Sequence, residues 1–187
     1  MKFIILTVCL AAISTFAKAQ QAYPTSAQFS IGLNTGLPLG KLHDSHTFIL
    51  GGYIQEAIPV AKALHVIINL GYNKFFGKST FNLQSPNTPY VDFPDADILA
   101  AKGGLRYYLS PKFYLQGEAG IALVLKSPQS SYDAAKAFIY SPKIGYAIAA
   151  GGKSIIDVSL RYEATNNYAD SYRGNISSIS VGVAYGF

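Results

Sequence analysis

Side chains of alternating polarity recur in eight segments of this chain, and this pattern constrains the fold more than any other feature. In one segment, Ile156, Val158 and Leu160 alternate with polar residues. Successive side chains of a β-strand point to opposite faces of a sheet, so a period of two indicates a strand with one apolar face. The eight predicted strands are 27–36, 48–58, 63–76, 95–109, 113–124, 137–150, 154–164 and 175–187.

The connections between these segments alternate in length. Three short joins, rich in Pro, Gly and Lys, fall at 59–62, 110–112 and 151–153, and four long joins fall at 37–47, 77–94, 125–136 and 165–174. Tight turns at one end and long loops at the other indicate an antiparallel up-and-down sheet. An even strand number with this asymmetry is typical of barrels of the outer membrane. The predicted fold is an all-β, eight-stranded antiparallel up-and-down transmembrane β-barrel.

The first nineteen residues have the features of an export signal. Lys2 precedes the apolar stretch 3–16, and Ala17 and Ala19 occupy the small-residue positions of a cleavage site. The apolar stretch is short for crossing a membrane. We predict a cleaved signal peptide at 1–19 and one outer-membrane β-barrel domain at 20–187.

Composition excludes several classes of protein. The single cysteine, Cys9, leaves with the signal peptide, so the mature chain has no disulfide and no thiol site. The formal net charge is +5, and loss of Lys2 and Lys18 lowers it to +3. This mild charge does not indicate a nucleic-acid partner. No mature segment offers the run of apolar residues that a membrane-spanning helix needs. No cofactor is predicted.

A soluble barrel with an internal ligand cavity, such as a lipocalin, is the structural alternative. Its apolar faces would point inward and its charges outward. The chain has no Trp and lacks the Gly-x-Trp pattern of a lipocalin first strand, and its loop asymmetry also favours the membrane barrel. The membrane barrel places the polar face inside. Six charges share that face: Lys102, Arg106, Glu118, Asp157, Arg161 and Glu163.

The export signal, the eight strands and the last strand together resemble the small outer-membrane β-barrel family of OmpA/OmpX type. The resemblance covers about residues 23–187 and is most specific at the end of the chain, VGVAYGF. It implies that the apolar face contacts outer-membrane lipid and that both termini are periplasmic. It also implies that the last strand is a signal for the barrel-assembly machinery, carried by Val181, Val183, Tyr185 and Phe187. Because Trp is absent, Tyr and Phe must form the aromatic girdles at the membrane interfaces.

The six inward charges allow two interpretations. They could line a pore and select ions, or they could form a paired ionic network that fills the interior. An eight-stranded barrel leaves a space just wide enough for side chains, and unpaired charges there are costly to desolvate. The sequence therefore favours a filled interior, with a small passive pore as the third functional alternative.

The second functional alternative is a lipid acyl hydrolase. It would need Ser45, or another serine, beside His43, His46 or His65 and an acid. Neighbouring groups on one loop rarely supply this oriented geometry, and we predict no enzyme activity and no metal site. The predicted function is a role in membrane integrity or in surface contact, with an unknown extracellular ligand at the four long loops.

Two strands are irregular in sequence. Pro142 removes a backbone donor from a barrel without free edges, so we expect a bulge or a late strand start there. The stretch FILGGYIQEAI is ambiguous about which parity faces inward.

Overall fold

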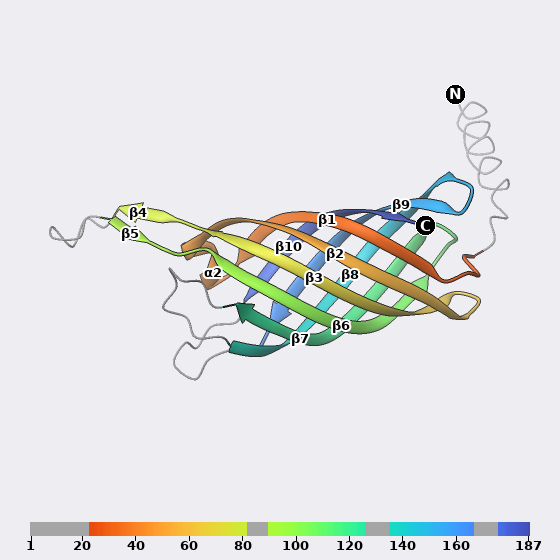
Figure 1. Cartoon of the computed structure of the whole chain (residues 1–187), viewed down its shortest axis with the longest axis horizontal. Coiled ribbons are helices and arrows are strands. Elements are labelled where there is room, and N and C mark those ends of the chain that lie inside the picture. Colours follow the sequence, from red (N-terminus) through yellow and green to blue (C-terminus); the bar gives the residue numbers. More distant parts are fainter. Residues whose placement is uncertain (1–22, 82–89, 126–134, 167–175) are drawn as a thin grey trace, which may run out of the picture.

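The computed structural model describes residues 23–81, 90–125, 135–166 and 176–187. Eight of its strands close into one antiparallel barrel in the order β1-β10-β9-β8-β7-β6-β3-β2 (Figure 1). The barrel strands are β1 (Gln28–Leu39), β2 (His46–Ala61), β3 (Leu64–Gly77), β6 (Ala96–Tyr108), β7 (Phe113–Leu125), β8 (Ala135–Gly151), β9 (Ser154–Thr165) and β10 (Ser177–Gly186). The predicted up-and-down barrel is confirmed.

The register of the strands sets the width and tilt of the barrel. A path along paired residues leaves β1 at Phe29 and returns to β1 at Leu39, ten residues further on. This path runs through Glu56, Ile68, Gly103, Ala119, Tyr140, Ala164 and Ser177. Such a stagger tilts the strands by about 35–45° from the barrel axis and, with eight strands, gives a narrow interior.

The two ends of the barrel differ. At the short-turn end lie the joins β2–β3, β6–β7 and β8–β9, the start of β1 and the end of β10. Gly151 and Gly152 have φ angles of 103° and 58°, which only glycine adopts readily, and they close the β8–β9 turn. The four longer connections lie at the other end, called the loop end here. The chain closes where Phe187 N donates to Phe29 O at 2.9 Å.

Several local features were not predicted. A short helix, α2 (Lys41–Ser45), lies between β1 and β2, and a two-stranded ribbon of β4 (Ser79–Phe81) and β5 (Tyr90–Asp92) projects beyond the loop end between β3 and β6 (Figure 1). Pro59 lies within β2, at a register shift, and not in the turn. No described helix is long and apolar enough to cross a membrane.

The expectation for Pro142 was wrong. β8 begins at Ala135, and it pairs with β7 through Gly117 and Pro142. On the β9 side, the pairs Tyr140–Ala164 and Lys143–Arg161 share one register. The strand therefore passes the proline without a bulge, and only the β8–β9 ladder is interrupted there.

The outer face of the barrel is apolar. The sequence left open which side chains of β2 face inward. In the structure, Ile54 and Ile58 point outward and Tyr53 and Gln55 point inward. Exposed aliphatic side chains cover the other strands in the same way. Exposed aromatic residues gather near the short-turn end (Phe29, Tyr107, Tyr146, Tyr185 and Phe187) and in the loop half (Phe48, Tyr72, Phe138 and Tyr140). This arrangement gives the two aromatic girdles without Trp.

Charges on the outer face lie near its two rims. Glu56 points outward opposite Phe29, so it lies at the level of the aromatic girdle of the short-turn end. Near the loop end, the Lys74 ammonium lies 3.0 Å from the Asp95 carboxylate, and Lys136 is exposed close to the start of β8. A belt without charge therefore separates the rims, as a lipid-facing surface requires.

A pair of substitutions tests the two faces of β10. Val181 is 51% exposed on the apolar face, whereas Ser180 is 6% exposed inside the barrel, opposite Arg161. We expect Val181→Asp to prevent insertion, because a carboxylate in the middle of the lipid face costs on the order of a few kcal/mol. Ser180→Asp should insert, because its carboxylate meets a cation. The yield of folded barrel after reconstitution measures both, and equal loss in the two variants would show that the faces are assigned wrongly.

Candidate functional site

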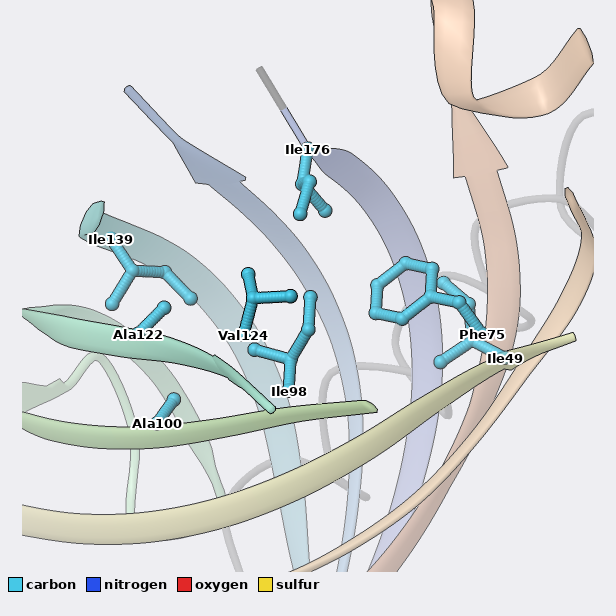
Figure 2. Packing of buried hydrophobic residues seen from close by; sticks show 8 residues of the cluster. All are labelled: Ile49, Phe75, Ile98, Ala100, Ala122, Val124, Ile139 and Ile176. Carbon is cyan, nitrogen blue, oxygen red and sulfur yellow. The ribbon is translucent and has the colours of Figure 1, made fainter. Parts of the chain in front are cut away.

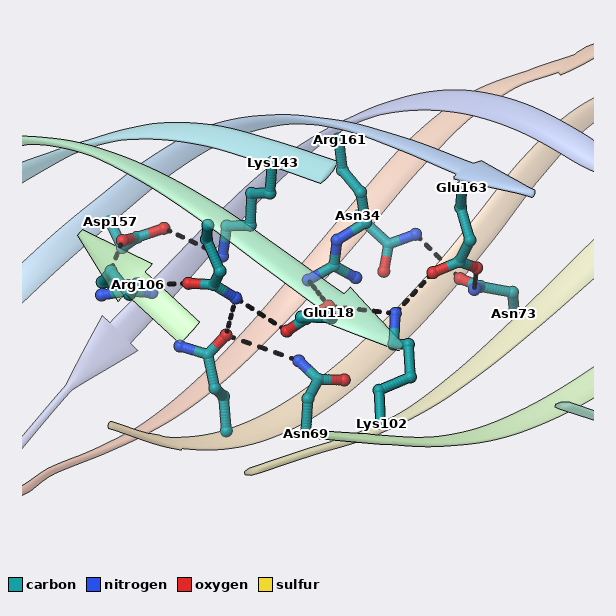
Figure 3. A network of polar contacts seen from close by, with 12 residues as sticks. Asn34, Asn69, Asn73, Lys102, Arg106, Glu118, Lys143, Asp157, Arg161 and Glu163 are labelled. Atoms are coloured by element: carbon teal, nitrogen blue, oxygen red, sulfur yellow. Dashed lines mark hydrogen bonds and ion pairs between the residues drawn. The ribbon is translucent and has the colours of Figure 1, made fainter. Parts of the chain in front are cut away.

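The barrel interior brings the six predicted charges together. Lys102, Arg106, Glu118, Asp157, Arg161 and Glu163 all point inward and are at most 7% exposed. They come from β6, β7 and β9, where they alternate with the outward apolar residues. They lie within a larger polar network (Figure 3).

Lys102 is the centre of the network. Its ammonium lies 2.5 Å from the Glu163 carboxylate and 3.3 Å from the Glu118 carboxylate. Asn73 donates to the other oxygen of Glu163 at 3.2 Å and accepts from Asn34 at 2.8 Å. One cation thus joins two carboxylates from different strands, and the amides extend the network to β1 and β3.

A second group lies toward the short-turn end. Arg106 donates through Nε to Gln116 Oε1 at 2.7 Å, and its guanidinium lies 3.8 Å from both the Asp157 carboxylate and the Tyr114 ring centre. Tyr114 donates its hydroxyl to Asp157 at 2.6 Å. Gln116 also donates to Glu118 at 2.7 Å and thus links the Arg106 group to the Lys102 group.

Large side chains fill the space over inward glycines. A Cβ at Gly145 would lie 2.2 Å from the Tyr114 ring, and a Cβ at Gly32 would lie 2.5 Å from the Tyr53 ring. These two aromatic rings therefore occupy volume that only a glycine on the neighbouring strand leaves free. Among the described residues, side chains therefore pack closely around these two rings.

Sequence reasoning missed part of this network. The missed members are Asn34, Gln55, Asn69, Asn73, Tyr114 and Lys143. The amide side chains were left out of the predicted network because they carry no charge, although the alternation in the sequence places them on the inward face. Lys143 was missed because Pro142 made the phase of its strand uncertain.

The loop half of the interior is apolar, which the sequence did not predict. Its buried cluster is made of Ile49, Phe75, Ile98, Ala100, Ala122, Val124, Ile139 and Ile176 (Figure 2). Near the loop end both parities are apolar, as in Leu123-Val124-Leu125, so alternation no longer identifies the inward side. A polar layer and an apolar layer thus fill successive levels of the barrel.

Contacts at the loop end attach the ribbon and α2 to the barrel. Asp95 accepts from Gly77 N–H at 3.0 Å and pairs with Lys74, and Lys78 N donates to Ser45 O at 2.9 Å. The Gly77 hydrogen bond, followed by the Lys74 ion pair, lowers the pKa of Asp95 below its usual 3.8. The ionised Asp95 carboxylate therefore contributes fully to the stability of this region at a pH above its ordinary pKa. This contribution is lost as the pH falls through the lowered pKa.

The candidate hydrolase residues do not form a triad. Ser45 Oγ lies 2.8 Å from His46 Nδ1 and donates to Leu42 O at 3.2 Å, so it closes a local turn. His46 Nε2 has no hydrogen-bond partner among the described residues. His43 is exposed, and His65 lies near the short-turn end, where its Nε2 is 3.1 Å from Pro24 O. In the described parts of the chain, no three His, Cys, Asp or Glu residues are placed to hold a metal ion.

The residues of the predicted assembly signal lie on β10 and, in the case of Phe187, directly after it. Val181, Val183, Tyr185 and Phe187 all face outward. The Phe187 ring stacks on Phe29, with ring centres 6.4 Å apart, and meets Tyr185 edge to face at 5.0 Å. The predicted signal peptide lies outside the described residues, as do Tyr132, Tyr168 and Tyr172, three tyrosines of the predicted long loops that could belong to a binding surface or to a girdle.

Comparisons with known proteins give the fold. No family model and no curated protein matches the chain. Among solved structures, it is similar to Ail, the attachment invasion locus protein of Yersinia pestis, with 13% identity and a TM-score of 0.51 over 86% of this chain and 97% of that one. It is also similar to the outer membrane protein OprG from Pseudomonas aeruginosa, with 12% identity and a TM-score of 0.52 over 89% and 98%. The chain therefore has the fold of the small eight-stranded outer-membrane β-barrels.

Proposed function

We propose that this protein is a sealed barrel of the outer membrane that stabilises the membrane and presents its loop end for contact at the cell surface. The filled interior carries the proposal. A polar layer centred on Lys102 and an apolar layer around Phe75 and Ile98 occupy the barrel in series. Ions would have to break paired charges in one layer and cross an apolar region in the other, and both steps are costly.

The construction of the loop end supports a role in surface contact. The β4–β5 ribbon projects past the barrel, and α2 is joined to the base of the ribbon through Ser45 and Lys78. Backbone hydrogen bonds and the Lys74–Asp95 ion pair connect these parts to the barrel. Pre-organised elements lose little conformational entropy when a partner binds. The partner itself is an unknown extracellular ligand.

The first experiment tests the seal. We expect the reconstituted protein to give no stable conductance steps in planar bilayers. Single truncations such as Arg161→Ala in the polar layer or Phe75→Ala in the apolar layer should stay closed, because the other layer remains. Steady, ion-selective conductance of the unmodified protein would instead support the pore.

The second experiment tests the orientation. The only cysteine of the chain lies in the predicted signal peptide, so single introduced cysteines can be labelled selectively. Ser79→Cys, at an exposed position at the start of β4, should react with a membrane-impermeant maleimide on intact cells. Lys153→Cys, in the β8–β9 turn, should react only after the outer membrane is permeabilised, because the short-turn end is periplasmic. The reverse labelling pattern would contradict the proposed orientation.

The third experiment separates the assembly role of Phe187 from its packing. Deletion of Phe187 should reduce the amount of barrel inserted in cells several-fold, while refolding of the purified chain into detergent changes little. Phe29→Ala is the matched control, because it removes the same ring stacking and leaves the terminal aromatic in place. If the two variants insert equally well in cells, Phe187 acts only through packing and the assembly role is wrong.

A further inference from the structure

Four cations and three carboxylates share the polar layer of the interior. The cations are Lys102, Arg106, Lys143 and Arg161, and the carboxylates are Glu118, Asp157 and Glu163. The described inward residues therefore carry an excess of one positive charge, with the histidines taken as neutral. A net charge inside a narrow barrel that lies in a membrane is strongly unfavourable.

The excess charge can be located from the ion pairs. Lys102 is held by two carboxylates at 2.5 and 3.3 Å. Arg106 has hydrogen bonds to Gln116 and Tyr108 and faces Asp157. Asp157, in turn, already accepts the Tyr114 hydroxyl on both oxygens. Lys143 Nζ and Arg161 NH2 are the cationic donors of this layer that lack a hydrogen-bond partner among the described residues.

Lys143 and Arg161 both have donors without an acceptor. The Lys143 ammonium is 3.6 Å from Asp157, and Arg161 NH2 is 3.9 Å from Glu118, both beyond hydrogen-bond length. Lys143 Nζ and Arg161 NH2 are buried and find no hydrogen-bond partner among the described residues. A buried ammonium or guanidinium donor without an acceptor is rare in folded proteins.

The two cations also lie directly opposite each other. Lys143 on β8 and Arg161 on β9 are paired across the strands and point into the same interior (Figure 3). Like charges in this arrangement repel each other. The Tyr53 ring centre lies 5.3 Å from the lysine ammonium and 4.8 Å from the guanidinium, so both cations lie near the same aromatic ring.

We propose that Lys143 and Arg161 form an internal binding site for one small monovalent anion, chloride under ordinary conditions. A single negative charge neutralises the excess and gives both donors an acceptor. A divalent oxyanion would overcompensate the charge, and the packing by Tyr53, Tyr114 and Gln116 favours an ion of the smallest size. The anion enters as the barrel folds and stabilises the folded state.

The experiment compares halide with an anion too large for the interior. The unfolding midpoint in urea is measured in detergent micelles, with sodium bromide replacing sodium gluconate at constant ionic strength. We expect the unmodified protein to be stabilised in a saturable way, with an equilibrium constant for folding about tenfold higher at a bromide concentration near ten times its dissociation constant. Crystals grown in bromide should show an anomalous peak beside Lys143 Nζ and Arg161 NH2.

Three variants sharpen the test. Lys143→Met removes the excess charge and should abolish the bromide dependence. Ser180→Asp places a fixed carboxylate opposite Arg161 and should also make stability independent of bromide, which keeps the test valid if Lys143→Met does not fold. Lys136→Met, at an exposed position, should keep the full dependence. The proposal is overturned if bromide and gluconate give equal stability and no anomalous peak is present, or if Lys143→Met retains the dependence.

Discussion

Closure of the sheet is the constraint on which the rest of this structure depends. A strand in lipid must have every backbone donor and acceptor paired, so β1 has to meet β10 and no edge can remain. With eight strands and a stagger of ten residues, closure also sets the interior to the width of a few side chains. The interior must then be filled, and the charges that fill it must be paired. The outward apolar belt and the inward polar network are two consequences of the same closed sheet.

The interior contains one layer of polar side chains and one layer of apolar side chains. Toward the short turns, Lys102, Arg106, Lys143 and their carboxylate and amide partners connect all barrel strands except β10, which contributes small inward residues such as Ser180 and Gly182. Toward the loops, Phe75, Ile98 and their neighbours form an ordinary apolar core. The polar layer fixes strand register through directional bonds, and the apolar layer excludes water. The two layers in series are the basis for the proposal that the barrel does not conduct.

The sequence predicted the barrel because period-two alternation and loop asymmetry are local signals, and both are strong here. It also identified six interior charges. These residues lie on the face of each strand opposite to its apolar face, and in a membrane barrel that face points inward. It did not reveal the apolar layer, because residues such as Val124 lie in runs where both parities are apolar. It also misjudged Pro142, because the β8–β9 ladder skips two pairs there without a shift in register. Pairings such as Lys102 with Glu163 depend on which strands face each other across the barrel, and alternation carries no information about that.

The central claim is that the interior charges hold the barrel together as mutually paired groups. A double-mutant cycle on Lys102 and Glu163, with unfolding free energies measured in lipid vesicles, tests it most directly. Lys102→Met alone should destabilise the barrel by about 3–5 kcal/mol, because it leaves buried carboxylates uncompensated. Combining it with Glu163→Gln should recover a large part of that loss. If Lys102→Met costs no more than Lys136→Met at the surface, and Glu163→Gln recovers nothing, the interior network does not hold the barrel and the account is wrong.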